Sequence, residues 1–341
     1  MKSISKKSII EIKKHLSGNP EILLLTHVDP DGDAIGSLLA LYHYFRLREF
    51  HVTAITPNDF PGFLQWLPGS EAIIRFTKKK KTASELIDKA GVIFNLDFND
   101  LERLGRMDNV VRKAKAYKIL IDHHPDNQSF NDLEITDTSV SSTAELIFQV
   151  LNKMETKPFL TKEMAECLYT GILTDTGCFS YNSSHADTFR TVAELLETKI
   201  DKDRVFNLVY NNFSETRMKL LGFSLNEKMT VLPQYNTAYI SLTIDEMKRY
   251  NFSVGDSEGF VNYPLSIKGI CFSALFLERK DHVKISFRSK GNFPVNRFSE
   301  KHFNGGGHIN AAGGESFESL NATLRKFHSL VEEYAGQLMK T

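Results

Sequence analysis

Apolar positions in the first half of the chain form short continuous runs that alternate with longer amphipathic stretches. Strand-sized runs lie at 22–26, 51–55, 92–96 and 117–121, and helical periodicity is seen at 34–48, 142–151 and 162–173. Strands that alternate with helices predict right-handed crossovers and a parallel sheet. The pattern therefore predicts an α/β fold whose first domain is a doubly wound parallel sheet.

The second half has a different pattern. A charged, helical stretch at 199–228 includes Asp201 as a candidate helix N-cap, and strand-like runs follow at 238–242, 269–277 and 282–288. A glycine-rich loop at 305–307 and a last helix at 320–338 complete a smaller mixed α/β domain. We expect three regions, namely the first domain at 1–196, a helical connector at 197–230 and a C-terminal domain at 231–341.

Acidic and imidazole side chains cluster where the apolar runs of the first half end. His27, Asp31 and Asp33 follow the first run, Asp97 follows a later one, and Asp122-His123-His124 follow the next. Such side chains at strand ends of an α/β sheet lie in the crevice where these folds bind ligands. Buried carboxylates without partners are costly, so cations are expected among them. The arrangement predicts a two-metal hydrolase.

The first cluster lies in a turn that contains Pro30 and Gly32, which fold the loop tightly enough to bring three side chains to one side. Imidazole mixed with carboxylates suits Mn²⁺, or Co²⁺, Fe²⁺ or Zn²⁺, better than Mg²⁺. The alternative for Asp31 and Asp33 is a solvated turn that caps the next helix.

The other acidic and imidazole residues also have two interpretations. Consecutive side chains of an extended chain point to opposite sides, so His123 and His124 are expected to divide into one ligand and one group that faces substrate. Asp175 ends a helical run and is either a further ligand or an ordinary polar residue at a helix end.

Composition narrows the substrate. The chain of 341 residues carries 42 Lys and Arg against 42 Asp and Glu, and this balance favours a small anionic substrate over long nucleic acid. The basic run at 78–81 is interpreted as a solvated loop. Three scattered cysteines fit a reducing compartment, and no membrane span or export signal is visible, so a cytoplasmic protein is expected. No activated Ser or Cys nucleophile is evident, which agrees with attack by water.

Four motifs together resemble the DHH phosphoesterase superfamily, and within it the bifunctional oligoribonuclease (nanoRNase) and pAp phosphatase group. They are THVDPDGDAIGS at 26–37, DHH at 122–124, TDTG at 174–177 and GGGH at 305–308. The resemblance implies one metal held by His27, Asp31 and Asp97. It implies a second metal held by Asp33, Asp97, His123 and Asp175.

The resemblance also assigns catalytic and substrate-binding roles. Asp97 would bridge the metals, Asp122 would orient its neighbouring imidazole, and His124 would face the scissile phosphate. In the second domain the implied terminal-phosphate pocket would present glycine N–H groups at the start of a helix. The pocket residues are Arg288, Ser289, Gly305, Gly306, Gly307 and His308. Arg103 either reaches substrate or forms a surface ion pair.

The resemblance implies a hydrolase with two divalent ions, expected to be Mn²⁺. Its substrates would be short 5′-phosphorylated oligoribonucleotides, cut to nucleoside monophosphates, and the nucleotide bisphosphate pAp. The alternatives are an exopolyphosphatase or pyrophosphatase, and a nucleotide-sensing module without catalysis. Neither long DNA nor a membrane is an expected partner, and the sequence leaves open whether the chain forms a homodimer.

Overall fold

Two separate six-stranded sheets form the cores of the chain. The computed structural model describes residues 4–125, 128, 130–156, 159–253 and 255–340. The chain divides into an N-terminal unit, Met1–Asn212, and a C-terminal unit, Phe213–Thr341. This boundary lies inside the segment 197–230, which was expected to be a connector.

The sheet of the N-terminal unit is parallel throughout, with strand order β3-β2-β1-β4-β5-β6. Its four central strands are those predicted from the apolar runs. The two edge strands were not predicted, because β3 has two residues and β6 has four, and neither is apolar throughout. The strands are β1 (Ile22–Thr26), β2 (Val52–Thr56), β3 (Ile74–Arg75), β4 (Val92–Leu96), β5 (Tyr117–Asp122) and β6 (Leu133–Thr136).

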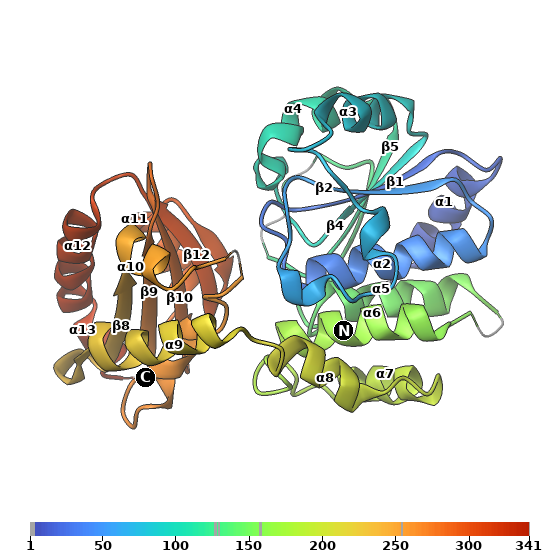
Figure 1. Cartoon of the computed structure of the whole chain (residues 1–341). Helices are drawn as coiled ribbons and strands as arrows, with labels where there is room; N and C mark the ends of the chain where they lie inside the picture. The colour runs from blue at the N-terminus through green and yellow to red at the C-terminus, as the bar shows by residue number, and fades with distance from the viewer. Residues whose placement is uncertain (1–3, 126–127, 129, 157–158, 254, 341) are drawn as a thin grey trace. The chain divides into compact units, whose positions relative to one another are not determined.

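Helices cover both faces of this sheet, as a doubly wound fold requires (Figure 1). One face packs against α1 (Lys6–Leu16), α2 (Gly32–Leu47) and α5 (Thr143–Met154), and α6 (Lys162–Asp175) packs on α2 and α5. The other packs against α3 (Lys80–Lys89), the 3₁₀ segment η3 (Leu101–Met107) and α4 (Asp108–Lys113). Two further helices, α7 (Ala186–Glu197) and α8 (Lys202–Tyr210), complete the unit. Asp201 caps α8 as predicted, since its carboxylate accepts a hydrogen bond from the Arg204 N–H.

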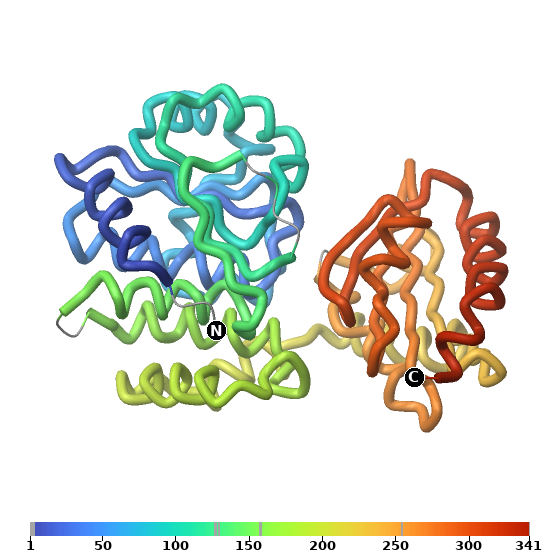
Figure 2. The backbone as a smooth tube through the Cα atoms, turned by 180° about the vertical axis from the view of Figure 1, so that it is seen from behind, coloured from blue at the N-terminus to red at the C-terminus, as the bar shows by residue number. Residues whose placement is uncertain are grey.

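The C-terminal unit contains a mixed sheet of order β11-β12-β10-β9-β8-β7, in which β8 and β9 are parallel and the other pairs antiparallel. A phenylalanine-rich core lies between one face and α11 and α12, and Figure 2 shows α12, in red, along the sheet. The other face packs against α9 and α10. The strands are β7 (Met229–Leu232), β8 (Thr237–Leu242), β9 (Phe272–Glu278), β10 (Val283–Ser289), β11 (Gly306–His308) and β12 (Ala311–Ser316). The helices are α9 (Glu215–Phe223), α10 (Ile244–Arg249), α11 (Val295–His302), α12 (Leu320–Glu333) and α13 (Ala335–Leu338).

The glycine triplet at 305–307 is not the loop before a helix that was predicted. Gly306 and Gly307 belong to β11, which pairs antiparallel with β12. A Cβ atom on Gly305 would lie 1.9 Å from the carbonyl oxygen of Gly313, and Gly307 has φ 136°. The glycines therefore allow a close approach of two strands, a use that the spacing of glycines alone does not distinguish from a flexible loop.

Glycines also set the close crossing of α2 and α6 near the carboxyl edge of the N-terminal sheet. A Cβ on Gly32 would lie 2.3 Å from Thr174 Oγ1, and one on Gly36 would lie 2.5 Å from the Cys167 carbonyl oxygen. Both distances are far shorter than a van der Waals contact. The spacing of the two helices thus depends on the absence of these side chains.

Replacing Gly36 tests the crossing. We expect Gly36→Ala to lower the free energy of unfolding by about 1–3 kcal/mol, since the added methyl group meets backbone and forces the helices apart. The measurement is urea denaturation. Gly62→Ala is the control, because nothing lies within 4 Å of a Cβ there. Equal effects of the two substitutions would contradict this account of the crossing.

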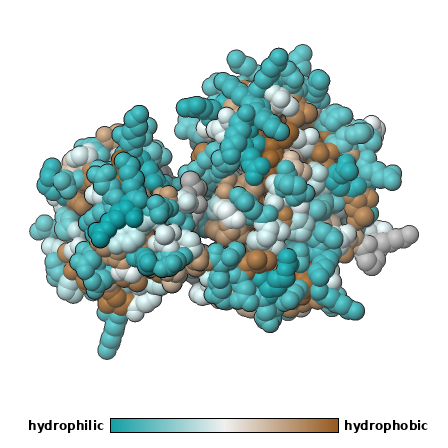
Figure 3. Space-filling view, in the orientation of Figure 1, coloured by the Kyte–Doolittle hydropathy of each residue, from teal (hydrophilic) through white to brown (hydrophobic). Residues whose placement is uncertain are grey.

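Hydrophilic side chains dominate the surface of the N-terminal unit over α3 and α4, and apolar residues lie between them in small groups (Figure 3). Within the described residues, no helix combines the length and the apolar character that crossing a membrane requires.

Candidate metal centre

Three neighbouring strands bring the predicted site residues to one edge of the sheet. His27 follows β1, Asp97 follows β4, and Asp122 is the last residue of β5. The strands lie in the order β1-β4-β5 and run in parallel, so their carboxyl ends meet at the same edge. These three residues and His123, which follows β5, are almost completely buried, with exposed fractions of 4% for His27, 2% for Asp97, 0% for Asp122 and 1% for His123.

Asp97 lies at the centre of the group. Its Oδ2 is 3.6 Å from His27 Nε2, and its Oδ1 is 3.7 Å from both His123 Nε2 and His124 Nδ1. The Thr143 hydroxyl donates a 2.7 Å hydrogen bond to the same Oδ1. Asp97 also has φ 65°, in the left-handed region that costs free energy for residues other than glycine. Such strain at a buried carboxylate is characteristic of a functional position.

The six predicted ligands form two neighbouring groups. Ligand atoms of His27, Asp31 and Asp97 lie within 4.8 Å of one another, as do those of Asp33, His123 and Asp175. His123 Nε2 is 3.8 Å from Asp33 Oδ2 and 3.5 Å from Asp175 Oδ2. A cation with ligand distances of about 2.0–2.2 Å holds neighbouring donor atoms roughly 3–4 Å apart, so the donor set and its spacing fit a divalent ion.

The start of α5 supports Asp33, an arrangement that the sequence analysis did not identify. The backbone N–H groups of Thr143 and Ala144 donate to the two carboxylate oxygens of Asp33 over 2.7 and 2.9 Å. The helix is capped by Ser142, whose hydroxyl accepts from the Glu145 N–H. Ser142 and Glu145 have the spacing of a capping box, so the sequence signals the helix start but not what it contacts.

The carboxylates of this group repel one another when no cation is bound. The pKa of Asp33 is raised well above its usual range by burial and by the charges of Asp97 and Asp31. Burial likewise raises the pKa of Asp97. His124 opposes this increase, and the charges of Asp31, Asp122 and Asp175 add to it. A divalent cation would offset these negative charges.

This electrostatic balance predicts a pH-dependent effect of metal on stability. A pKa that is higher in the folded than in the unfolded chain adds stability below the unfolded value, about 3.9 for Asp. That stability is lost as the pH rises through the folded pKa values of Asp33 and Asp97. We therefore expect Mn²⁺, compared with EDTA, to raise the melting temperature more at pH 7.5 than at pH 5. Equal increases at both pH values in thermal denaturation would contradict this account.

Asp122 and His124 form a hydrogen-bonded pair on the exposed side of the group. Asp122 Oδ1 is 2.7 Å from His124 Nδ1. Burial opposes the charged form of both groups, but the His124 imidazole lowers the pKa of Asp122, and the Asp122 carboxylate raises the pKa of His124. The carboxylate thus favours a His124 that carries its proton.

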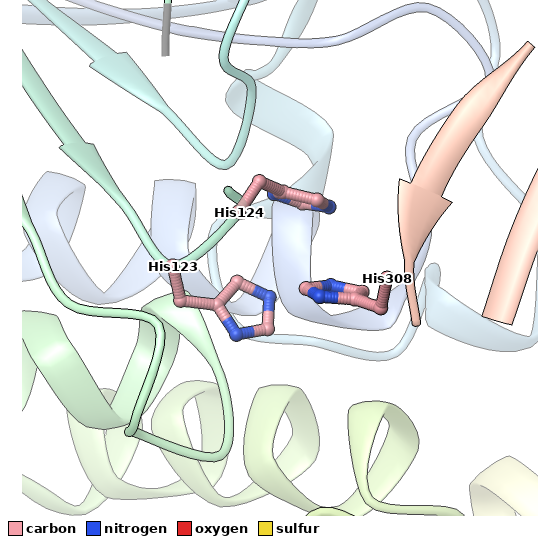
Figure 4. A group of neighbouring side chains, drawn as sticks. All are labelled: His123, His124 and His308. Atoms are coloured by element: carbon pink, nitrogen blue, oxygen red, sulfur yellow. The ribbon is translucent and has the colours of Figure 1, made fainter. Parts of the chain in front are cut away.

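The rings of His123 and His124 lie 4.9 Å apart at an interplanar angle of 71° (Figure 4). His123 faces Asp33 and Asp175 and is buried, whereas 15% of the His124 side chain is exposed. The two imidazoles thus differ in exposure, and the division into one ligand and one group that faces substrate remains a prediction.

His27 and Asp31 are fixed by local hydrogen bonds. His27 Nδ1 lies 2.8 Å from the Val28 carbonyl oxygen, a contact that requires Nδ1–H as donor and leaves the Nε2 lone pair for a cation. Burial, followed by the charge of Arg103, lowers the pKa of His27 and favours this neutral form. Asp31 Oδ1 accepts from the N–H groups of Asp33 and Ala34. The capping interpretation of Asp31 is therefore correct, and it is compatible with membership of the ligand group.

Arg103 lies on η3, exposed and close to the site. The Val28 N–H donates to the Arg103 carbonyl oxygen over 2.7 Å, which ties η3 to the loop that follows β1. The Arg103 charge also lowers the pKa of Asp31 and opposes protonation of His124. Within the described part of the chain, Arg103 has no carboxylate at ion-pair distance, so its guanidinium is available to an anion.

The candidate phosphate-pocket residues lie together in the sheet of the C-terminal unit. Arg288 and His308 both pair in register with Ala311, from opposite sides of β12. Ser289 donates to the Phe293 carbonyl oxygen over 2.7 Å and accepts a 2.8 Å hydrogen bond from the Asn310 side chain. Register thus brings a guanidinium, a hydroxyl and an imidazole to one end of the sheet.

Phe293 and Phe303 flank the pocket residues in the sequence. Phe293 is 2% exposed and Phe303 is 0% exposed. Both belong to the phenylalanine-rich core. Their role is therefore core packing, and their rings are not available to stack on a base.

Comparison with known proteins covers both units. Residues 21–172 match the DHH family, N-terminal domain, and residues 235–336 match the DHHA1 domain. The bifunctional oligoribonuclease and PAP phosphatase NrnA of Bacillus subtilis is 28% identical, over 95% of this chain and 99% of its own. The Thermus thermophilus protein of that name is 29% identical, over 89% of this chain and 86% of its own. The crystal structure of an exopolyphosphatase-related protein from Bacteroides fragilis is 43% identical, covers 99% of each chain and has a TM-score of 0.94.

Proposed function

Because the chain belongs to the DHH family of phosphoesterases, we propose that it hydrolyses short 5′-phosphorylated oligoribonucleotides to nucleoside monophosphates and dephosphorylates pAp. Family membership makes the chain a metal-dependent hydrolase of phosphate esters. The names of the Bacillus and Thermus relatives support the choice of substrates, and these relatives align with most of the chain.

The convergence of six donor residues, Asp97 among them, carries the proposal. We propose that His27, Asp31 and Asp97 hold one ion, and that Asp33, Asp97, His123 and Asp175 hold the other. Mixed imidazole and carboxylate donors favour Mn²⁺. Two such cations, when bound, lower the pKa of a water molecule and neutralise charge on the phosphoryl group.

The remaining residues act on the substrate. In our proposal Asp122 holds the His124 ring so that the imidazole delivers a proton to the departing oxygen, and Arg103 stabilises a phosphoryl oxygen. In the C-terminal unit, Arg288, Ser289 and His308 bind the 5′-phosphate, with Gly305, Gly306 and Gly307 keeping the adjacent strands close.

A product assay tests the substrate directly. The protein with Mn²⁺ is given pApA, pGpG, a five-nucleotide RNA and pAp, beside polyphosphate, pyrophosphate and cyclic di-AMP, and products are identified by chromatography. We expect mononucleotides from the linear RNA substrates and AMP from pAp. Rapid polyphosphate breakdown beside inert dinucleotides would contradict the proposal.

The second candidate function is polyphosphate hydrolysis. The observation that favours it is the similarity to the Bacteroides fragilis structure, whose name relates it to exopolyphosphatases. The same metal centre could serve that reaction, so the substrates in the assay above decide between the two. The complete set of six metal donors disfavours a nucleotide sensor without catalysis. The substitution Asp97→Ala separates the two cases, because a sensor would keep its regulatory behaviour whereas an enzyme would lose turnover.

A further inference from the structure

Five basic side chains lie within seven residues at the end of the edge strand β3. They have no place in the proposed metal or phosphate sites. Arg75 ends β3, and four exposed lysines, Lys78, Lys79, Lys80 and Lys81, follow it. Lys79 is the N-cap residue of α3, and Lys80 and Lys81 lie in the first turn. The expected solvated loop is therefore in part the start of a helix.

The parallel sheet places this basic cluster at the edge that carries the metal centre. Because β3 runs parallel to β2, and β2 parallel to β1, the residues that follow β3 lie at the same carboxyl edge as His27. β3 is two strands from β1, which corresponds to about 10 Å in the direction of the inter-strand hydrogen bonds.

Hydrogen bonds connect the basic cluster to the metal-centre loop. Asp29 and the Asn58 side chain exchange two hydrogen bonds, of 2.8 and 2.6 Å. The next residue, Asp59, lies 2.6 Å from Lys78 Nζ and 3.7 Å from Arg75 Nε. The loop after β2 therefore contacts both places. Through Asn58 it is hydrogen-bonded to the turn that bears His27 and Asp31, and through Asp59 it pairs with the basic cluster.

The positive charges of this cluster outnumber the carboxylates that pair with them among the described residues. The first turn of α3 contains no acidic residue, and its N-cap makes no side-chain hydrogen bond. Lysines there oppose the partial positive charge of the helix start and repel one another. Among the described residues, Asp59 is the carboxylate that pairs with the cluster, so one negative charge faces five positive ones.

Arg75 is held in place by its neighbours. Its guanidinium lies over the Phe60 ring at 4.8 Å, and Nη1 donates to the Ile73 carbonyl oxygen over 3.2 Å. Its buried Nε makes no hydrogen bond with any described residue, because the 3.7 Å distance to Asp59 exceeds hydrogen-bond range. The buried Nε is out of reach of an incoming anion, but 25% of the Arg75 side chain is exposed, and a guanidinium fixed in this way suits a phosphate at the surface.

We propose that Arg75 and Lys78–Lys81 form an accessory subsite for the backbone phosphates of single-stranded RNA, beyond the phosphate at the metal centre. The inference rests on the proposed function and extends it to substrate length. pAp is too short to reach the cluster, whereas an RNA of about five nucleotides can contact both places. The subsite would raise kcat/KM for the longer substrates.

The test is the triple variant Lys79→Gln/Lys80→Gln/Lys81→Gln. We expect its kcat/KM for a five-nucleotide RNA to fall about tenfold, and the salt dependence to weaken, because fewer counterions are released. Its kcat/KM for pAp should change less than about twofold, since pAp does not reach the cluster. The matched control is Lys89→Gln/Lys113→Gln/Lys115→Gln, which removes the same charge. These lysines lie where α3 and α4 end and just before β5 begins, at the amino ends of the parallel strands and away from the metal centre.

Equal losses on both substrates, an equal loss in the control, or no loss would overturn the subsite. If the wild-type protein hydrolyses none of the RNA substrates, the proposed function fails. The subsite is then judged by fluorescence anisotropy of a labelled five-nucleotide RNA in EDTA, where weaker binding by the variant than by the control supports it. Equally strong competition by tripolyphosphate, lost in the same variant, would overturn the assignment to RNA.

Discussion

Asp97→Asn is expected to lower kcat/KM by at least about a thousandfold while the chain remains folded. Asp97 faces His27 through one oxygen and His123 through the other, so its replacement removes a ligand from both proposed ion sites. Asn tolerates the left-handed backbone at this position, so the loop keeps its shape.

The same substitution should stabilise the metal-free protein. Because the pKa of Asp97 is raised by burial and by neighbouring carboxylates, ionising it at neutral pH costs folding free energy. The amide has no such cost, so urea denaturation in EDTA at pH 7.5 should show a gain of about 1–3 kcal/mol. Asp245→Asn, at an exposed site, is the control. Retention of more than a tenth of the activity, or an unfolded variant, would contradict the role given to Asp97.

Asp122→Asn is expected to lower kcat by about a hundredfold or more and to shift the pH profile. The Asp122 carboxylate raises the pKa of His124, and protonated His124 is the proposed acid. Activity is lost as the pH rises through that pKa. Without the carboxylate the pKa falls, so the basic limb of the profile should move to lower pH.

A double variant separates this effect from a general disturbance of the site. If Asp122 acts through the His124 ring, to which it is hydrogen-bonded, then Asp122→Asn/His124→Gln should be no slower than His124→Gln alone. Additive losses, or a basic limb that does not move, would show that Asp122 acts in another way.

The strand pattern was sufficient to predict that three of the polar positions lie at one edge of the sheet, whereas the place of Asp175 in the group was implied by the family resemblance. His27, Asp97 and Asp122 each directly follow an apolar run. Because the strands are parallel, their carboxyl ends lie at one edge of the sheet, and this does not depend on the exact register of pairing. The prediction therefore needed only the strand pattern and the rule that ligand sites lie at carboxyl ends.

The supporting contacts could not be predicted, because they depend on tertiary geometry. The Thr143 hydroxyl reaches Asp97 across 46 positions of sequence, and the left-handed backbone of Asp97 has no signal in the residue type. Likewise, the place of the basic cluster follows from the pairing of β3, which is only two residues long. Strands this short have no readable periodicity.

The central claim is that Asp97 joins two cation sites, and the most direct measurement is the number of Mn²⁺ ions bound per chain by isothermal titration calorimetry. We predict two ions for the metal-free wild-type protein and the loss of tight binding at both sites in Asp97→Asn. A wild-type protein that binds one ion or none, or an Asp97→Asn variant that still binds two, would contradict the account.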